Sequence, residues 1–444
     1  MRARAGFLLV GALLLGAAGA SAQVGIVFNR AGSGARAAGM ANAFIAISDD
    51  GTAASWNPAG LGQLRRPELS LVSATAARSF SAEGFRTRDD LAVFSPVRSS
   101  YQSTFLEFAS LAVPVTIAGK PVTFQAAWRR LYTLDYRESV STTREPLVPE
   151  GAPAVSIDGN NDIVGAIDLL AIAGAIKLTP RVALGTSLNL WRGSWRIDEV
   201  ATVAALDPPG PTAFRQFRQD NRINGESFSA GLLLTYPRWS AGFLYLSPLH
   251  SDLRTTSSLA LSGVPPLPTE VVEGTIRFAR SVGLGGAWRP DPRWTVALDL
   301  TWDDWSGTEL DSPPTGRVNF FDQQPLDRTS TRDTLSVNAG AEHLFHGEGF
   351  VVPLRFGAAW EPQGPRSPYT RDPVDFVMLA AGGGYNTNRF KLDAAVQFRW
   401  SHFRDGGRYG FEDSPPLLPS SVGERNIKEW RLKLSVIVRF PDAR

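Results

Sequence analysis

The chain has 444 residues, with 45 basic and 43 acidic side chains and a formal net charge of +2. This near balance, without clustered Lys and Arg, argues against a nucleic-acid surface. There is no cysteine, which excludes disulfides and Cys-ligated metal sites. Beyond the N-terminal leader no apolar run reaches the roughly 18 residues that a membrane-spanning helix needs, so a helical membrane protein is excluded.

The N-terminus has the pattern of an export signal. Arg2 and Arg4 precede an apolar run over residues 7–18, and Ala20-Ser21-Ala22 is a small-residue cleavage site. We expect residues 1–22 to be removed as a signal peptide, so that the mature chain begins at Gln23. An uncleaved membrane anchor is the alternative, but the apolar run is short for a span.

Residues 23–67 do not have the pattern of a strand. A glycine-rich stretch over residues 32–39 is followed by a short apolar run, by Asp49-Asp50-Gly51 and by Trp56-Asn57-Pro58-Ala59. The glycine spacing matches neither a dinucleotide fingerprint nor a phosphate-binding loop. Asn57 and Pro58 predict a turn, because Pro fixes φ and Asn bonds its neighbouring backbone. We expect a compact, loop-rich domain here.

From residue 68 onward, apolar residues recur at every second position. Trp294, Val296, Leu298, Leu300 and Trp302 share one face of a segment whose other face is largely polar, and the last segment before the C-terminus repeats this pattern. Such alternation predicts strands. Runs of about ten residues with aromatic residues at both ends favour a transmembrane barrel over a soluble sandwich, whose strands are usually about five or six residues long.

Fourteen strands are predicted, and the connections between them alternate in length. Short turns follow the even-numbered strands and long polar connections follow most odd-numbered ones, as in outer-membrane barrels with periplasmic turns and extracellular loops. A barrel of this width is not filled by its own side chains, so residues 23–67 are predicted to plug it. The fold class is therefore all-β, a transmembrane antiparallel β-barrel over residues 68–444. The strands are predicted near residues 68–79, 104–117, 121–136, 163–178, 181–198, 222–236, 239–253, 272–289, 293–306, 332–345, 350–361, 374–387, 389–402 and 426–440.

Three segments resemble the FadL/TodX family of outer-membrane transporters. The stretch GARAAGMANAFIAISDDGTAASWNPAGLGQL is similar to the family's N-terminal hatch, and Asn57-Pro58-Ala59 matches its hatch motif. WSAGFLYLSPLHSDL and WTVALDLTWDDWS resemble barrel segments. The resemblance implies a fourteen-stranded barrel, a small hatch in the lumen, a lateral exit through the wall, and long-chain fatty acids or hydrophobic compounds as cargo.

Two groups of apolar residues are candidate substrate contacts. Leu259, Leu261, Val264 and Leu267 lie in the predicted connection after the seventh strand, which is unusually apolar for an exposed loop. They either capture hydrophobic molecules or pack on neighbouring loops. The second group would close a pocket from the hatch side and comprises Val24, Ile26 and Phe28.

The predicted third strand contains a candidate exit. Trp128 and Tyr132 lie on its apolar face, but Arg130 falls on the same face. A cation turned to lipid costs about 2–4 kcal/mol at the midplane and little near an interface. Either Arg130 snorkels at the outer rim, or a bulge at Arg129, Arg130 and Leu131 breaks the ladder. A broken ladder would supply the lateral exit, which the resemblance places in this strand.

No catalytic pattern stands out. His343 and His346 lie at a strand end and do not share a face as they would on a helix, and the neighbours Asp303 and Asp304 point to opposite faces of a strand. No nucleophile motif occurs. We expect a protein without enzymatic activity, cofactor or metal.

The sequence therefore predicts an outer-membrane channel for passive uptake of hydrophobic small molecules, by hatch rearrangement and lateral exit. Long-chain fatty acids, alkanes and aromatic hydrocarbons are all left open as substrates. The alternatives are a non-transport barrel of the same fold that acts as a secretion or assembly partner, and an outer-membrane enzyme. Expected partners are the substrate, outer-membrane lipid and lipopolysaccharide, and the barrel-assembly machinery during biogenesis. We expect no nucleic acid and a monomer.

Overall fold

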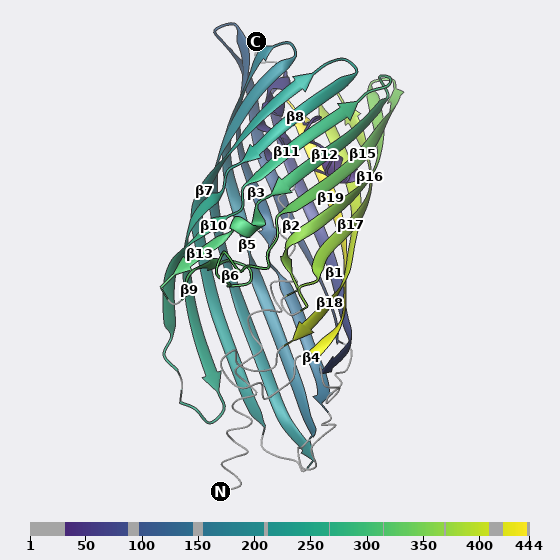
Figure 1. Cartoon of the computed structure of the whole chain (residues 1–444). Coiled ribbons are helices and arrows are strands. Elements are labelled where there is room, and N and C mark those ends of the chain that lie inside the picture. Colours follow the sequence, from purple (N-terminus) through teal and green to yellow (C-terminus); the bar gives the residue numbers. More distant parts are fainter. Residues whose placement is uncertain are drawn as a thin grey trace.

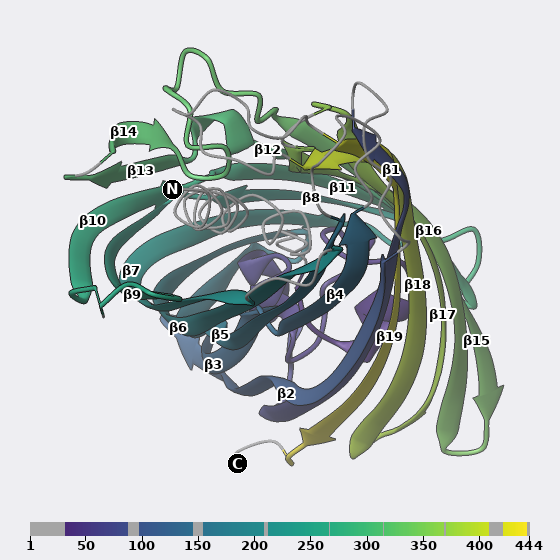
Figure 2. The same ribbon diagram turned by 90° about the horizontal axis from the view of Figure 1, so that it is seen from below.

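The computed structural model describes residues 32–87, 97–144, 154–207, 212–265, 267–313, 315–367, 370–407 and 421–441. The predicted signal peptide and the candidate contacts Val24, Ile26 and Phe28 lie outside these ranges. Within them, nineteen strand segments form one antiparallel sheet, which closes where β1 (Glu68–Thr87) pairs with β19 (Ser421–Arg439) (Figure 1 and Figure 2). Closure pairs the first strand with the last, so neither of them ends the sheet with a free edge.

The segments make up fourteen barrel strands over the described residues, as predicted. Three barrel strands are interrupted, namely β3 with β4, β8 with β9 and β10 with β11, and β13 and β14 form an additional hairpin that pairs with β10. Between β1 and β19 the bounds are β2 (Val97–Ile117), β3 (Lys120–Thr133), β4 (Tyr136–Arg144), β5 (Ala154–Thr179), β6 (Val182–Asp207), β7 (Ala213–Thr235), β8 (Trp239–Leu246), β9 (Leu249–Leu261), β10 (Glu270–Phe278), β11 (Ser281–Trp288), β12 (Trp294–Asp303), β13 (Glu309–Ser312), β14 (Gly316–Asn319), β15 (Thr334–Gly347), β16 (Phe350–Arg366), β17 (Pro373–Thr387) and β18 (Phe390–Gly407).

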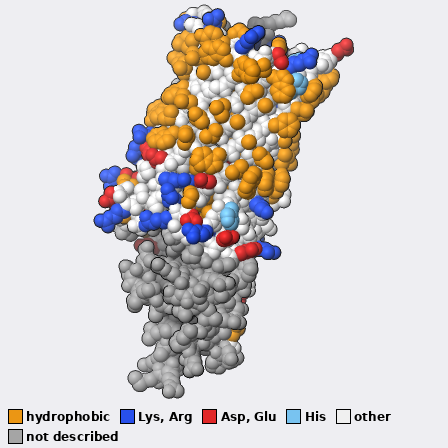
Figure 3. Space-filling model, turned by 45° about the vertical axis from the view of Figure 1, so that its right-hand side comes forward, with side chains coloured by type: hydrophobic (Ala, Val, Ile, Leu, Met, Phe, Trp, Pro, Cys, Tyr) orange, Lys and Arg blue, Asp and Glu red, His pale blue; other side chains and the backbone are white. Residues whose placement is uncertain are grey.

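Apolar side chains face outward and form a belt around the barrel. On the face shown in Figure 3 the belt covers the part of the wall near the short turns, and charged side chains gather beyond it. Exposed tryptophans mark both edges: Trp239, Trp288 and Trp294 lie beside the short turns, and Trp360 and Trp430 lie farther along their strands. This is the aromatic girdle pattern of a membrane-spanning barrel. Among the described residues, no helix is long and apolar enough to cross a membrane.

The predicted alternation of connections is confirmed. Short turns join β2 to β3, β5 to β6, β15 to β16 and β17 to β18, with two residues between the strands in each case. The turns from β7 to β8 and from β11 to β12 lie at the same end of the barrel (Figure 1). The longer connections lie at the opposite end, so the barrel has the asymmetry expected of an outer-membrane protein.

Several predicted strand ends were wrong at the long-connection end. β5 begins at Ala154 and β9 continues to Leu261, well beyond the predicted bounds. Leu259 and Leu261 therefore belong to a strand and not to a loop, and they pair with Phe217 and Arg215 of β7. The reason is that strands extending beyond the apolar belt face water on their outer side, so they lose the alternation by which sequence reveals a strand.

Residues 32–67 lie inside the ring of strands (Figure 2), and this segment is called the plug below. It contains α3 (Ala35–Gly39), η1 (Ala53–Ser55) and η2 (Pro58–Gln63). Its polar backbone atoms are bonded by side chains from the wall. Asp299 accepts the N–H groups of Phe44 and Ile45 at 2.6 and 2.7 Å, and Gln397 donates to the carbonyl of Ala38 at 3.1 Å.

The wall meets the plug at inward-facing glycines. A Cβ on Gly357 would lie 2.5 Å from the carbonyl carbon of Met40, and one on Gly185 would lie 2.3 Å from that of Pro58. The same close approach to plug backbone recurs on other strands, at Gly242, Gly285 and Gly340. Because contacts under 3.0 Å require atoms to move, glycine at these positions lets the plug backbone seat directly on the wall.

Candidate functional site

A pocket lies in the lumen between the plug and strands β2, β3, β5, β6, β7 and β8. Ala54 and Ser55 of the plug form part of its lining. Its free volume is about 50 Å³, which is room for about three waters. Its apolar lining comes from Phe108, Ala127, Leu131, Leu169, Ala171, Trp191 and Leu246.

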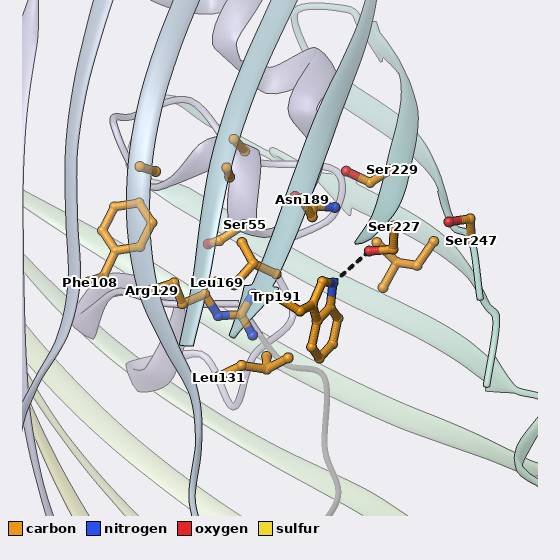
Figure 4. Close-up of a pocket in the computed structure, with 14 residues that line it drawn as sticks. Ser55, Phe108, Arg129, Leu131, Leu169, Asn189, Trp191, Ser227, Ser229 and Ser247 are labelled. Carbon is orange, nitrogen blue, oxygen red and sulfur yellow. Dashed lines mark hydrogen bonds between the residues drawn. The ribbon is translucent and has the colours of Figure 1, made fainter. Parts of the chain in front are cut away.

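The pocket also has a polar side. Arg129 extends toward Trp191 and Leu131 (Figure 4), and its side chain is largely buried. The Trp191 indole donates to the Ser227 hydroxyl at 2.8 Å. Further polar lining comes from Ser55, Asn189, Ser229 and Ser247. The pocket therefore combines apolar walls with one cation and several hydroxyl and amide groups, which is the composition of a site for an amphipathic molecule.

The β2–β3 ladder ends beside this pocket. Phe108 and Arg129 are its last register pair among the described residues, although β2 continues to Val97 and the interrupted partner strand continues to Arg144. We call the wall beyond this pair the unpaired seam. Most of the hydrogen bonds of the partner strand there go to β5 on its other side.

Two bulges flank the end of the ladder. The β1–β2 register shifts between Val72 and Ser73, which leaves Glu107 as an extra residue of β2. The β3–β5 register shifts between Arg130 and Tyr132, which leaves Leu131 as an extra residue of β3. The bulge predicted at Arg129, Arg130 and Leu131 is therefore present. A bulge bends a strand and terminates regular pairing, so the two bulges explain why the ladder stops here.

The bulge in β3 reverses the direction of the side chains that follow it. Tyr132, Leu134 and Tyr136 are each at most 5% exposed and belong to the lumenal core. The interpretation that Tyr132 continues the outer apolar face was wrong, because a single inserted residue shifts the alternation by one. Behind the unpaired seam the Tyr136 ring stacks on Phe80 at 5.7 Å.

Arg130 stays on the outer face, before the bulge. Its Nε atom lies 3.0 Å from Asp168 Oδ1 on β5, and its guanidinium carbon is 5.7 Å from the Trp128 ring centre and 6.0 Å from that of Phe105. An acid partner and two aromatic faces accommodate a cation near the edge of the belt. The predicted break in regular pairing is therefore present beside Arg130, whose charge is paired with Asp168 on the outer face.

The hatch motif forms the predicted turn. The Asn57 side chain caps η2 by accepting the N–H of Ala59 at 3.1 Å, and Pro58 is the first residue of that helix. The Asn57 amide nitrogen also donates to the carbonyls of Ile45 and of Leu232 on β7, both at 3.1 Å. Asn57 thus joins two parts of the plug to the wall.

A buried ion-pair cluster holds the start of the plug. Arg36 pairs with Asp49 and with Glu342 on β15, and Arg355 bonds the same Glu342 at 2.7 Å. Burial by itself raises the pKa of Asp50, but Lys391 and Arg36 nearby and hydrogen bonds from Thr52 outweigh it and hold that pKa below its usual range. The plug is therefore fixed by charge as well as by packing.

The other predicted contacts lie away from the pocket. Val264 and Leu267 are exposed in the connection between β9 and β10, whereas Leu259 and Leu261 are partly buried in β9. None of the four lines the pocket.

Sequence reasoning missed the principal lining residues Phe108, Leu169 and Trp191. The available signal was an aromatic residue on a polar face. Trp191 shares its face of β6 with Ser187 and Asn189, so it points into the lumen and not toward lipid. An aromatic side chain on the otherwise polar lumenal face of a strand indicates an apolar contact inside the lumen.

The chain matches known proteins over most of its length. Residues 13–404 match the family described as outer membrane protein transport protein (OMPP1/FadL/TodX). A search of curated proteins by sequence found no match. Three solved structures are similar in fold. A Pseudomonas aeruginosa FadL homologue has a TM-score of 0.65 and 14% identity, with 94% of this chain and 99% of that chain covered.

The other two are toluene transporters. Pseudomonas putida TodX has a TM-score of 0.61 and 13% identity, and Ralstonia pickettii TbuX has 0.59 and 15%. In both, 94% of this chain and 100% of that chain are covered. The family match, the closed barrel and its apolar belt together show that this chain belongs to the OMPP1/FadL/TodX family of outer-membrane transport proteins.

Proposed function

We propose that this protein takes up hydrophobic molecules that carry an acidic head group and releases them sideways through the unpaired seam between β2 and β3. The observation that carries the proposal is that Phe108 and Arg129 both end the ladder and line the pocket. A molecule in the pocket is therefore next to the part of the wall that lacks strand pairing.

The lining supports the choice of substrate. A plain hydrocarbon needs only apolar contacts, whereas Arg129 adds a buried cation to the lining of this pocket. A guanidinium binds a carboxylate with two parallel hydrogen bonds, and such charge-assisted bonds are about twice as strong as neutral ones. Fatty acids therefore fit this pocket better than alkanes or aromatic hydrocarbons.

The size of the pocket supports a movement of the plug. Free space for about three waters does not hold a long acyl chain. Ala54 and Ser55 are the plug residues at the pocket, and they lie just before the Asn57-Pro58-Ala59 turn. We infer that this region of the plug rearranges when the substrate enters, which is the role the hatch motif predicts. Passage down a concentration gradient requires no energy source.

The test is a reversible closure of the seam. Leu106 and Arg130 are the outward-facing residues just beyond the last register pair, and the chain contains no cysteine. In the double variant Leu106→Cys with Arg130→Cys, oxidation should block dodecanoate uptake and reduction should restore it. Leu111→Cys with Ala126→Cys is the control, because these residues already pair across the intact ladder. Unchanged uptake by the oxidised seam variant would exclude this route.

A second test addresses the head group. In Arg129→Gln, dodecanoate binding should weaken while binding of its uncharged methyl ester stays as in the parent protein. Equal weakening of both would show that Arg129 shapes the pocket without recognising charge.

A further inference from the structure

A buried ion pair lies at the bulge of β2. Lys433 Nζ on β19 is 2.6 Å from Glu107 Oε1, and the two side chains are only 3% and 9% exposed. β1 lies between β19 and β2 in the sheet, so the pair crosses the inner surface of one strand. Buried charges of this kind are tightly coupled, because removing one partner leaves the other without compensation.

The position of this pair connects it with the pocket. Glu107 is the extra residue of the β2 bulge, and the next residue, Phe108, lines the pocket and pairs with Arg129. Arg129 also lies within electrostatic range of the Lys433 ammonium. Arg129, which lines the pocket, and the Glu107–Lys433 pair therefore lie on either side of Phe108, at the end of the β2–β3 ladder.

The other nearby acid is already engaged. Glu429 contacts Arg78, Arg399 and Arg431, at 2.5 to 2.8 Å. Glu107 therefore provides the negative charge for Lys433. Its second oxygen, Oε2, is buried and has no hydrogen-bond partner among the described residues. A buried oxygen without a hydrogen bond is unfavourable, so the Glu107 carboxylate is only partly satisfied by its bond to Lys433.

We propose that Glu107 is an internal competitor for the anionic head of the transported molecule. In the empty protein its carboxylate neutralises Lys433. When the head group reaches Arg129, Lys433 interacts with both the ligand carboxylate and Glu107. As the ligand leaves through the seam, Lys433 pairs with Glu107 alone again. Glu107 is thus a positioning residue that limits how tightly an anion is held. This inference rests on the proposed function and assigns that site its release step.

The variant Glu107→Gln tests this role because it keeps the shape of the side chain and removes its charge. The probes are dodecanoate and its methyl ester. We expect Glu107→Gln to bind dodecanoate more tightly, on the order of tenfold, since close buried charge pairs are coupled at least that strongly. The increase should be in residence time, so dodecanoate uptake should slow. Methyl dodecanoate should bind and pass as in the parent protein.

The matched control is Glu199→Gln. Glu199 is also buried and paired with an arginine, Arg215, at 3.2 Å, but it lies on β6 and not at the β2 bulge next to Phe108. The variant Glu199→Gln should bind and transport both probes as the parent protein does. Lys433→Gln supplies the opposite change and should weaken dodecanoate binding several-fold without affecting the ester. Heat-modifiable migration on a gel checks that each variant has folded. If Glu107→Gln does not fold, Glu107→Asp, which retains the charge, should bind and transport both probes as the parent protein does.

The outcomes separate the two proposals. If the parent protein binds neither probe, the proposed function fails. If the parent binds dodecanoate but Glu107→Gln has the same affinity and residence time, the competitor role is overturned and the proposed function stands. An equal change for acid and ester, or tighter binding without slower release, would likewise overturn it, because a purely structural effect of Glu107 does not distinguish the charge of the ligand.

Discussion

Phe108 of β2 and Arg129 of β3 are the last register pair of their ladder, and both side chains line the same lumenal pocket. One point of the wall thus combines a break in strand pairing with the principal basic group of the pocket. Bulges at Glu107 and Leu131 flank this pair, one on each strand. The arrangement makes the effects of several substitutions predictable.

Deleting Leu131 should repair the ladder and stop transport. Because Leu131 is the extra residue of β3 in its pairing with β5, its removal keeps Arg130 facing outward and Tyr132 facing the lumen and makes the β3–β5 pairing regular. A straightened β3 can then continue its pairing with β2 beyond Arg129. We expect dodecanoate uptake to be lost with heat-modifiable folding retained. Deleting a residue from the regular part of β3, such as Ala126, shifts every later side chain to the other face and should impair folding instead. Normal uptake without Leu131 would contradict a role for the bulge.

Gly357→Val should loosen the plug. A Cβ there meets the backbone of Met40 and Ala41 at 2.5 and 2.6 Å, so the plug has to move. We expect ion conductance in planar bilayers to rise above that of the parent protein. Gly286→Val is the control, since nothing lies within 4 Å of its Cβ position. If both variants conduct like the parent, the close seating of the plug on glycine is not what seals the barrel.

Asn57→Ala should release part of the plug without unfolding the barrel. The substitution removes the cap of η2 and leaves the carbonyls of Ile45 and Leu232 without the amide donor. A buried polar group left unpaired costs about 1–3 kcal/mol. Hydrogen exchange should therefore speed up over residues 44–60, whereas strand amides should exchange as before. Faster exchange throughout the strands would show that Asn57 supports the barrel itself.

Acid should weaken the attachment of the plug at Asp50. The pKa of this carboxyl is held below its usual range by Lys391 and Arg36, against the effect of its burial. A lowered pKa stabilises the folded plug above the usual Asp range, which lies near pH 4, and this contribution is lost as pH falls through the folded-state value. Exchange of the Gly51 to Ala53 amides should accelerate on acidification below about pH 4.

The isosteric variant supplies the control for this pH dependence. Asp50→Asn should exchange faster at pH 7, because it lacks the charge that Arg36 and Lys391 attract. Its exchange, corrected for intrinsic rates, should then change little on acidification. A parent-like acid response in Asp50→Asn would assign the titration to another group.

The strands of the barrel wall could be predicted from the sequence because the alternation of their side chains is a local pattern. Residues such as Trp294 to Trp302 alternate between lipid and lumen, and short turns separate such runs, so strand number and the direction of the asymmetry follow from neighbours in the chain. Arg130 on an apolar face indicated an irregularity, and the bulge is there. The strand ends beyond the apolar belt, such as Leu261 of β9, could not be predicted, because a strand with water on its outer face does not need to alternate apolar and polar residues.

The contacts inside the lumen depend on the tertiary structure. The Glu107–Lys433 pair joins residues that are 326 positions apart in the chain, and the plug carbonyl of Ala38 accepts a hydrogen bond from Gln397. Such contacts arise from closure of the sheet, which brings β19 beside β1 and folds the plug against nearly every strand. The sequence determines which face of each strand is lumenal, but the partner across the lumen depends on barrel curvature, bulge position and plug path, and no local pattern records these.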